Sequence, residues 1–394
     1  MNIHELLLQP ESRKLEFKRE LPDKLTEVMK TIAAFANGAG GELIIGVSDK
    51  DRRVEGVSDP LMLEERIANA IHDSIEPMIS PYISIFNFQG KELLIVRILP
   101  GSNKPYFIKS MGFDKGVYIR IGSTNRIAAS YICEELRRQS LGIAFETEMD
   151  ITKSPDDLDA EGLAFFFNNI GHDPSTCESM VKWLLLKKNN GDYFPTIAGL
   201  VLFGKSDIPD YDFAGIRLTK FQGNTMTTIS ETREYSTPIL PKMETICRNT
   251  ADFLKKESYL EGIRRIERTV IPFYAIREAI VNAVVHRDYS IRGSSIKINV
   301  FDNRMEVISP GILHGNLDIA DIGTGLSECR NRAIVRIFRK SGMMEELGTG
   351  IIRIYNLLAQ KSLSRPQFFE QGQFFKAVLP QEKESTTFLA GEEL

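Results

Sequence analysis

Glu278 and Asn282 stand four residues apart in a segment, 277–287, that otherwise has the apolar content of a buried helix. That spacing places the carboxylate and the amide on one helix face, one turn apart. Apolar neighbours such as Ala279 and Val284 cover the side that faces a core, so the two polar groups need a partner in apolar surroundings. A hydrated metal ion carried by a nucleotide would be such a partner. The simpler interpretation is a helix that ends in a solvated turn.

The residues that follow predict elements that would enclose this pair. Alternation over 295–308 predicts two strands joined by a turn at Asp302, and the second strand is closed by a Ser-Pro-Gly sequence that ends at Gly311. Farther along, Gly348-Thr349-Gly350 directly precedes an apolar helical segment at 351–358. Glycines at the start of a helix let backbone N–H groups approach a phosphate, and the helix dipole favours the anion. The ordered set indicates a nucleotide site more strongly than any single piece.

Residues 256–380, which contain this set, resemble the GHKL ATPase fold of gyrase, Hsp90, MutL and histidine kinases, in its divergent RecG-like or HATPase-like version. The resemblance implies that Asn282 holds Mg²⁺ and that Glu278 orients or deprotonates the attacking water. It also implies that Asp302 accepts a hydrogen bond from the adenine amino group. The ATP contacts that follow from the resemblance are Asn282, Asp302, Gly311, Gly348, Thr349 and Gly350.

Two features depart from that family. Asp302 is followed by Asn303 and Arg304, whereas the classical first glycine box is Asp-x-Gly-x-Gly, and Arg332 stands where the divergent family usually has proline. The segment 330–340 carries five cations that would suit a triphosphate, although a helix with a solvated basic side is the alternative.

A second group of candidate residues lies near the N-terminus. Period-two alternation predicts a strand in which Glu16 and Lys18 share the side away from the core. Glu11 lies just before this strand, and Asp49 follows a second predicted strand at 42–47. Neighbouring strands would bring the three carboxylates together beside one lysine, where they could hold one or two Mg²⁺ or Mn²⁺ ions for phosphodiester cleavage. The alternative is an ordinary charged sheet face with a turn aspartate.

The motifs Glu11-Ser12-x-x-x-Glu16-Phe17-Lys18, Ala36-Asn37, Gly40-Gly41 and Gly46-Val47-x-Asp49 occur in this order, and through them residues 1–135 resemble the Schlafen or AlbA-like domain. In Schlafen nucleases the residues corresponding to Glu11, Glu16 and Asp49 form the catalytic triad for RNA cleavage. In many bacterial relatives the domain is described as a DNA-binding module. The resemblance therefore implies a DNA or RNA partner, and a catalytic metal site at Glu11, Glu16 and Asp49, with Lys18 beside it, if the domain cleaves RNA.

Charge patterning adds a candidate nucleic-acid surface. Between Arg97 and Arg126 there are six cations and one acid, Asp114, with four aromatic residues among them. Basic groups interleaved with aromatics suit a nucleic-acid backbone with stacked bases. Equally, the alternation at 118–121 is typical of a strand with a solvated arginine. The candidate contacts are Lys104, Lys109, Lys115, Arg120 and Arg126.

Length and composition predict an α+β multidomain protein. The 394 residues suit two or three domains: a mixed α/β Schlafen/AlbA-like domain at 1–138, a small helical or winged-helix-like domain at 139–255, a GHKL two-layer α/β sandwich at 256–381, and an acidic tail at 382–394. No apolar run approaches the ~20 residues that cross a bilayer. The start of the chain lacks the pattern of a signal peptide, and the four cysteines are scattered without a CxxC pair, as in a cytoplasmic protein with reduced thiols.

These observations support three hypotheses. The first is an ATP-regulated nucleic-acid-binding protein, a transcriptional or stress regulator acting as a homo-oligomer, in which a glycine-containing lid near 312–326 closes over the nucleotide. The second is a metal-dependent ribonuclease that the GHKL domain gates, for example in phage defence. The third is a degenerate scaffold that neither binds ATP nor cuts. The overall charge of −4 argues only against a globally basic coat protein.

Overall fold

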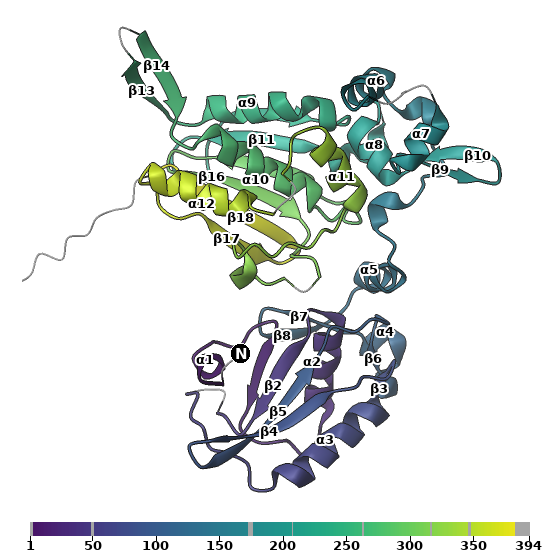
Figure 1. Cartoon of the computed structure of the whole chain (residues 1–394), viewed down its shortest axis with the longest axis vertical. Helices are drawn as coiled ribbons and strands as arrows, with labels where there is room; N and C mark the ends of the chain where they lie inside the picture. The colour runs from purple at the N-terminus through teal and green to yellow at the C-terminus, as the bar shows by residue number, and fades with distance from the viewer. Residues whose placement is uncertain are drawn as a thin grey trace, which may run out of the picture. The chain divides into compact units, whose positions relative to one another are not determined.

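The computed structural model describes residues 3–48, 51–171, 176–206, 208–261, 264–315, 317–345 and 348–382 of the chain, which is an α+β protein with mixed sheets. It divides into two units, Met1–Ile143 and Ala144–Leu394, each with its own core (Figure 1). The first boundary lies close to the one expected from the sequence. The segments expected as separate middle and C-terminal domains, however, belong to one unit.

The first unit is built on a four-stranded sheet with the order β1-β2-β5-β4. Its strands are β1 (Leu15–Lys18), β2 (Gly41–Ile45), β4 (Tyr82–Phe88) and β5 (Lys91–Ile98). β1 pairs in parallel with β2, and Glu16 stands opposite Leu43. The expected alternation is present, because Leu15 and Phe17 pack with α1 (Ile3–Leu7) on one face. Helices α2 (Thr26–Asn37) and α3 (Pro60–Ser74) pack on the other face.

The remainder of this unit is fastened to α2 through a buried asparagine. Asn37 Nδ2 donates to the carbonyl oxygens of Tyr106, at 2.8 Å, and Tyr118, at 2.9 Å, while its Oδ1 accepts from the Tyr106 N–H at 2.7 Å. These bonds hold the hairpin of β7 and β8 against the helix. The elements are β3 (Ile75–Glu76), β6 (Phe107–Ile108), α4 (Gly112–Gly116), β7 (Tyr118–Ile121), β8 (Thr124–Ile127) and α5 (Ser130–Leu141).

The second unit is built on a six-stranded sheet with the order β12-β11-β15-β16-β18-β17. Its strands are β11 (Ile216–Phe221), β12 (Ile229–Tyr235), β15 (Ile296–Val300), β16 (Arg304–Pro310), β17 (Gln367–Gln371) and β18 (Phe374–Pro380). β11 pairs in parallel with β15, so two strands of the expected middle domain belong to the same sheet as the expected GHKL strands. One hydrophobic core extends from Leu158 to Leu379. For this reason residues 139–255 do not form a separate unit.

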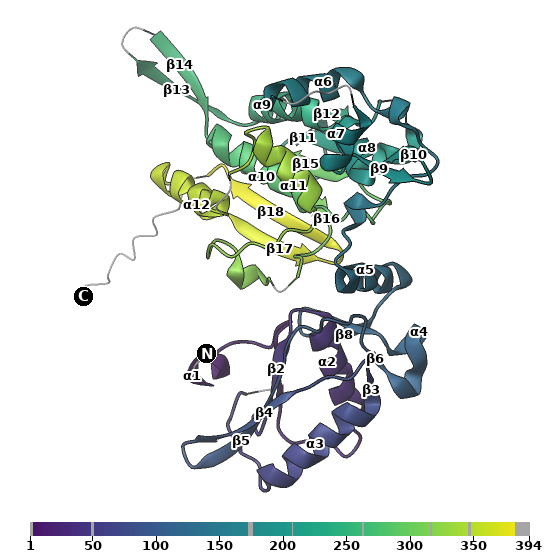
Figure 2. The same ribbon diagram turned by 45° about the vertical axis from the view of Figure 1, so that its right-hand side comes forward.

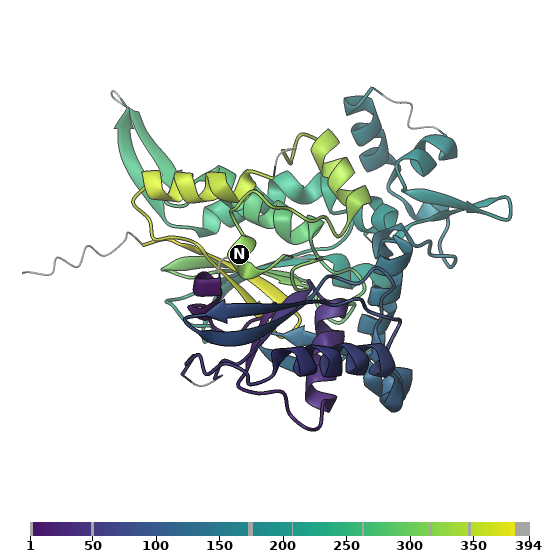
Figure 3. The same cartoon turned by 60° about the horizontal axis from the view of Figure 1, so that its bottom comes forward.

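Helices α9 (Met243–Phe253), α10 (Phe273–Val285) and α12 (Gly350–Gln360) form a layer over the sheet, as Figures 1 and 2 show. Beside this layer lie α11 (Arg332–Lys340), α6 (Ala160–Asn169), α7 (Cys177–Lys182), α8 (Ile197–Phe203) and the hairpin of β9 (Leu186–Asn189) and β10 (Asp192–Pro195). The hairpin of β13 (Lys256–Glu261) and β14 (Arg264–Thr269) projects from the unit (Figure 3). None of the described helices combines the length and the apolar content that crossing a lipid bilayer would require.

Candidate nucleotide site and carboxylate cluster

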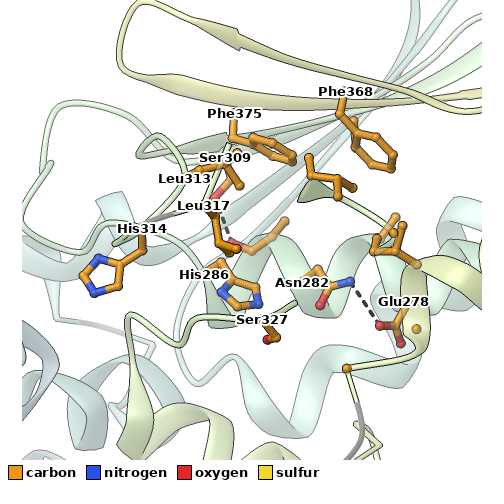
Figure 4. Close-up of a pocket in the computed structure, with 18 of the residues that line it drawn as sticks. Glu278, Asn282, His286, Ser309, Leu313, His314, Leu317, Ser327, Phe368 and Phe375 are labelled. Carbon is orange, nitrogen blue, oxygen red and sulfur yellow. Dashed lines mark hydrogen bonds between the residues drawn. The ribbon is translucent and has the colours of Figure 1, made fainter. Parts of the chain in front are cut away.

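Helix α10 carries the polar pair from which the sequence analysis began. The helix starts after Pro272 and buries nearly all of its apolar residues against the core. Glu278 is 5% exposed, and Asn282 Nδ2 donates to its Oε1 at 3.1 Å (Figure 4). Burial raises the pKa of Glu278 above the ordinary glutamate value, although the bond from Asn282 and the nearby Arg277 offset part of this. The prediction that the two side chains share one helix face is confirmed.

Glu278 and Asn282 line a hollow whose sides are formed by α10, strands β16 to β18, the described residues of segment 311–328 and the start of α12 (Figure 4). The hollow encloses about 1300 Å³, counted out to its open mouth. Phe368 and Phe375 contribute to an apolar wall, and Glu278 and Asn282 lie on the other side. An apolar wall that faces a few polar groups is the usual make-up of a small-molecule site, and it suits a flat base with a polar extension.

Glycines bring the start of α12 close to Glu278. Gly348 has a φ of +63°, which few other residues adopt readily. A Cβ at Gly350 would overlap the Glu278 carboxylate, so only glycine allows this approach. Thr349 precedes the helix without a capping hydrogen bond from its side chain in the described structure. Gly348 and Gly350 line the hollow, whereas Thr349, predicted to contact phosphate, is not among its lining residues. The start of a helix without a side-chain cap is a suitable place for the phosphates of a nucleotide.

The end of β16 forms another side of the hollow. Gly311 has a φ of +110°, and a Cβ there would lie 2.8 Å from the Cβ of Asp288. Ser309 lines the hollow, and its Oγ donates to the Ala283 carbonyl of α10 at 2.8 Å. Ser309 was not among the residues predicted from the sequence. Its position at the end of a predicted strand, two residues before a glycine, was the available signal.

Hydrogen bonds connect the loop after α10 with the start of α11. Asp288 Oδ2 lies 2.6 Å from Arg330 Nη1, and Arg330 Nη2 donates to the carbonyl oxygen of Ile312 at 2.8 Å. Burial acts to raise the pKa of Asp288, but Arg330 and the hydrogen bonds from Ser290 hold it below the ordinary value. Asn331 Nδ2 donates to the carbonyl oxygens of Val285 and Arg287, at 2.9 Å and 2.7 Å. One network of hydrogen bonds therefore connects the end of α10, the first residues of segment 311–328 and the start of α11.

His286 lies at the C-terminal end of α10 and lines the hollow. Burial, with Arg330 nearby, lowers the pKa of His286 to about 4. The ring is therefore neutral at physiological pH and adds no positive charge to the hollow.

In the first unit, cations engage the carboxylate at the centre of the N-terminal cluster. Glu16 is 7% exposed, its Oε1 lies 2.6 Å from Lys18 Nζ, and its Oε2 forms a buried ion pair with Arg120. Glu11 Oε1 accepts from the Phe17 N–H at 3.0 Å. Asp49 lies outside the described residues. Within the described ranges, no three His, Cys, Asp or Glu side chains come together as a possible metal site.

The described residues of this cluster, Glu11, Glu16 and Lys18, are poorly suited to bind a catalytic metal ion. A divalent cation needs carboxylate oxygens as ligands, and both oxygens of Glu16 already face positive groups. We therefore derive no metal-dependent step at Glu11, Glu16 and Lys18.

Comparison with known proteins identifies a domain in each unit. Residues 11–129 match the family model described as "Schlafen, AlbA_2", and residues 293–379 match the model described as "Putative ATP-dependent DNA helicase recG C-terminal", HATPase_c_4. The chain carries a Schlafen AlbA_2 domain and a RecG-type HATPase domain. It is accordingly an ATP-associated, nucleic-acid-related protein. The HATPase match begins after α10, so the placement of Glu278 and Asn282 rests on the geometry described above.

Two solved structures are similar to the chain. The DIP2311 protein from Corynebacterium diphtheriae is 21% identical with a TM-score of 0.49, over 94% of this chain and 76% of that one. The N-terminal domain of a RecG-related protein from Nitrosomonas europaea is 29% identical with a TM-score of 0.26, over 32% of this chain and 90% of that one.

Two expectations for the HATPase domain need correction. Asp302 does not line the hollow; it lies in the turn between β15 and β16, where its Oδ2 accepts from the Gly223 N–H at 3.1 Å. Asp302 is in the turn of this hairpin, whereas Val307, Ser309 and Gly311, from the end of β16 and the residue after it, line the hollow. The cations of 330–340 do not line it either. Arg330 is bonded to Asp288 and the Ile312 carbonyl, and α11 buries its apolar side and exposes Arg332, Arg336, Arg339 and Lys340.

Of the cations expected on the basic surface of the AlbA_2 domain, one, Arg120, is buried. Arg120 is 4% exposed and donates to backbone carbonyls at Ser12 and Leu15, so it is a structural residue. Lys104 and Lys109 donate to the carbonyl oxygens of Gly38 and His72. Lys115 and Arg126 are exposed. The tyrosines expected to stack on bases, Tyr106 and Tyr118, belong to the core.

Proposed function

We propose that the HATPase domain binds Mg·ATP in the hollow and that the nucleotide regulates nucleic-acid binding by the chain, in a transcriptional or stress-related role. The observation that carries this proposal is the approach of the Glu278–Asn282 pair to the glycine start of α12 at one end of an apolar hollow. A carboxylate, an amide and free helix N–H groups are suited to a hydrated cation with phosphates, while the apolar wall is suited to a purine.

Each residue has a separate role in this proposal. The Asn282 nitrogen is engaged with Glu278, which leaves its amide oxygen for a cation. Gly348, Thr349 and Gly350 present backbone N–H groups to phosphate. Bound Mg²⁺ supplies neutralisation of the phosphate charge. Glu278, whose pKa is raised by burial, orients a water and accepts its proton when the carboxylate is ionised.

Regulation would pass through segment 312–326. Its base is held by the bond from Arg330 to the Ile312 carbonyl and by a bond from the Leu313 N–H to Glu370 Oε1 at 2.8 Å. Gly315, Gly323 and Gly325 all have positive φ and supply the freedom that a lid requires. Contacts between the lid and bound phosphates would favour one arrangement of the network of hydrogen bonds around Arg330 and Asn331.

The first test is calorimetric titration of the full chain with ATP and Mg²⁺. We expect saturable binding that Asn282→Ala weakens at least about tenfold, since a metal ligand is removed. Asn356→Ala, at an exposed position of α12 that does not line the hollow, is the matched control and should bind as wild type does. An absence of binding, or equal affinities for both variants, would overturn the proposal and favour the degenerate scaffold.

The second test compares nucleic-acid affinity with and without a non-hydrolysable ATP analogue. The proposal requires a change in affinity in the wild type that disappears in Asn282→Ala. Light scattering under both conditions tests the proposed homo-oligomer. Identical affinity in the presence and absence of nucleotide would contradict regulation even if ATP binds.

A further inference from the structure

Helix α11 exposes a row of cations on the surface of the second unit. Its apolar residues are buried in the core: Ala333, Ile334, Val335, Ile337 and Phe338. Its exposed residues are Arg332, Arg336, Arg339 and Lys340, whose spacing places them along one face. The described part of the chain pairs none of these four with a carboxylate, and the sequence has no acid between Glu328 and Glu345.

A second acid-free segment adjoins this face. From Ser179 to Gly191 the chain has three lysines and no acid. Arg336 joins the two segments, because its guanidinium lies 4.2 Å from the Trp183 ring centroid and its Nη1 donates to the Lys182 carbonyl at 2.9 Å. In Figure 2, α11 lies beside the α7–α8 region from which β9 and β10 extend. Lys182 and Lys188 are exposed there.

We propose that this basic face, formed by Arg332, Arg336, Arg339 and Lys340 of α11 with Lys182 and Lys188 beside it, binds the phosphate backbone of nucleic acid. The four helical cations span about 12 Å along the axis, a length over which a DNA duplex carries about seven phosphate charges. Guanidinium groups match phosphate oxygens bidentately. The helix that carries them is packed on the core, so its backbone needs no ordering on binding.

The composition of the face argues against two other anionic partners. A helix that lies on a membrane surface inserts apolar side chains beside its basic ones, whereas the apolar side chains of α11 are all in the core. A single nucleotide would engage one or two of the cations and leave the rest of the row unused. Contacts to phosphate carry no base preference, so the face would bind many sequences.

Hydrogen bonds at the start of α11 connect the basic face to the elements that line the hollow. Asn331, the residue before α11, bonds the end of α10, and Arg330 bonds Asp288 and the carbonyl of Ile312. The surface is therefore a rigid part of the HATPase-containing unit. It differs from the surface expected on the AlbA_2 domain.

The test measures fluorescence anisotropy of a short labelled DNA duplex of mixed sequence with the full chain over a range of salt concentrations. We expect Arg332→Glu/Arg339→Glu to weaken binding at least about tenfold and to reduce the slope of log affinity against log salt by about two, one for each phosphate left without its arginine. The matched control is Arg217→Glu/Arg248→Glu, an equal charge change at exposed arginines of the same unit that pair with Glu234 and Glu244. The control should stay within about twofold of wild type.

A milder variant, Arg339→Gln/Lys340→Gln, removes two charges without reversing them and should also weaken DNA binding. It tests the face even if the charge-reversal variant fails to fold. Equal effects of test and control variants, or unchanged affinity in both α11 variants, would overturn the proposal and assign binding to the AlbA_2 domain. Binding of the wild type to phosphatidylserine vesicles without binding to DNA would overturn it in favour of a membrane surface.

Discussion

Arg287 offers the sharpest test of how the loop beside the hollow is held. Its side chain is fully buried, and burial lowers the pKa of Arg287 to about 10, so it is still charged at neutral pH. Nη1 donates to the Asp288 carbonyl at 2.9 Å, and Nη2 lies 2.7 to 3.2 Å from the carbonyl oxygens of Phe213, Ile291 and Ser294. We predict that Arg287→Met, which keeps much of the volume, strongly destabilises the second unit.

The magnitude follows from the groups left behind. Four carbonyl oxygens lose a charged donor, and each buried acceptor without a partner costs about 1–3 kcal/mol. The substitution also removes the free-energy cost of burying the Arg287 charge, and this offsets part of the destabilisation. We therefore expect a loss of about 3–5 kcal/mol in the free energy of unfolding. Arg292→Met is the matched control: Arg292 is exposed and lies 5.5 Å from the same Phe213 ring, so its loss should cost under about 0.5 kcal/mol.

The assay is urea unfolding followed by tryptophan fluorescence. Trp183 is the single tryptophan of the chain and is buried in the second unit, so its emission reports that unit alone. The midpoint should shift with little change in slope. A loss below about 1 kcal/mol in Arg287→Met, or equal losses in the two variants, would refute the proposed role of Arg287 in this loop.

Three further predictions concern single residues. Gly350→Ala places a Cβ on the Glu278 carboxylate and should weaken Mg·ATP binding in calorimetry at least about tenfold, whereas Gly293→Ala, with open space around it, should not; equal affinities would contradict the site. His286 has its pKa lowered to about 4 from 6.5, so the stability it contributes is present above pH 6.5 and lost as pH falls through 4. His286→Gln should remove up to about 3 kcal/mol of that pH dependence in unfolding at pH 7 and pH 4, and an unchanged dependence would count against it. Arg120→Met leaves Glu16 buried with one fewer cation, so we expect faster hydrogen exchange of peptides from β1. The control is Arg126→Met at an exposed position, which should change this exchange far less. Similar exchange in the two variants would contradict the role of Arg120.

Local patterns in the sequence predicted the features that depend on spacing. The four-residue interval between Glu278 and Asn282 predicted one helix face, and the two side chains form a hydrogen bond on α10. Alternation near Glu16 predicted β1 and its two sides. Both follow from geometry within one element, which the order of residues determines.

Features that depend on tertiary contacts were not predictable in this way. The basic side of α11 was expected near a triphosphate, because periodicity shows that a helix has a polar side but not what lies opposite it. Arg120 was expected at the surface, since its partner Glu16 is 104 residues away in the chain. The parallel pairing of β11 with β15 likewise joins segments that the sequence suggested as separate domains.

The central claim is tested most directly by a crystal structure of the chain with Mg²⁺ and a non-hydrolysable ATP analogue. We predict phosphates at the Gly348–Gly350 start of α12, the metal at Asn282, and the purine against the apolar wall near Phe375. A nucleotide bound elsewhere, or a hollow filled by the protein's own side chains at saturating ligand, would contradict it.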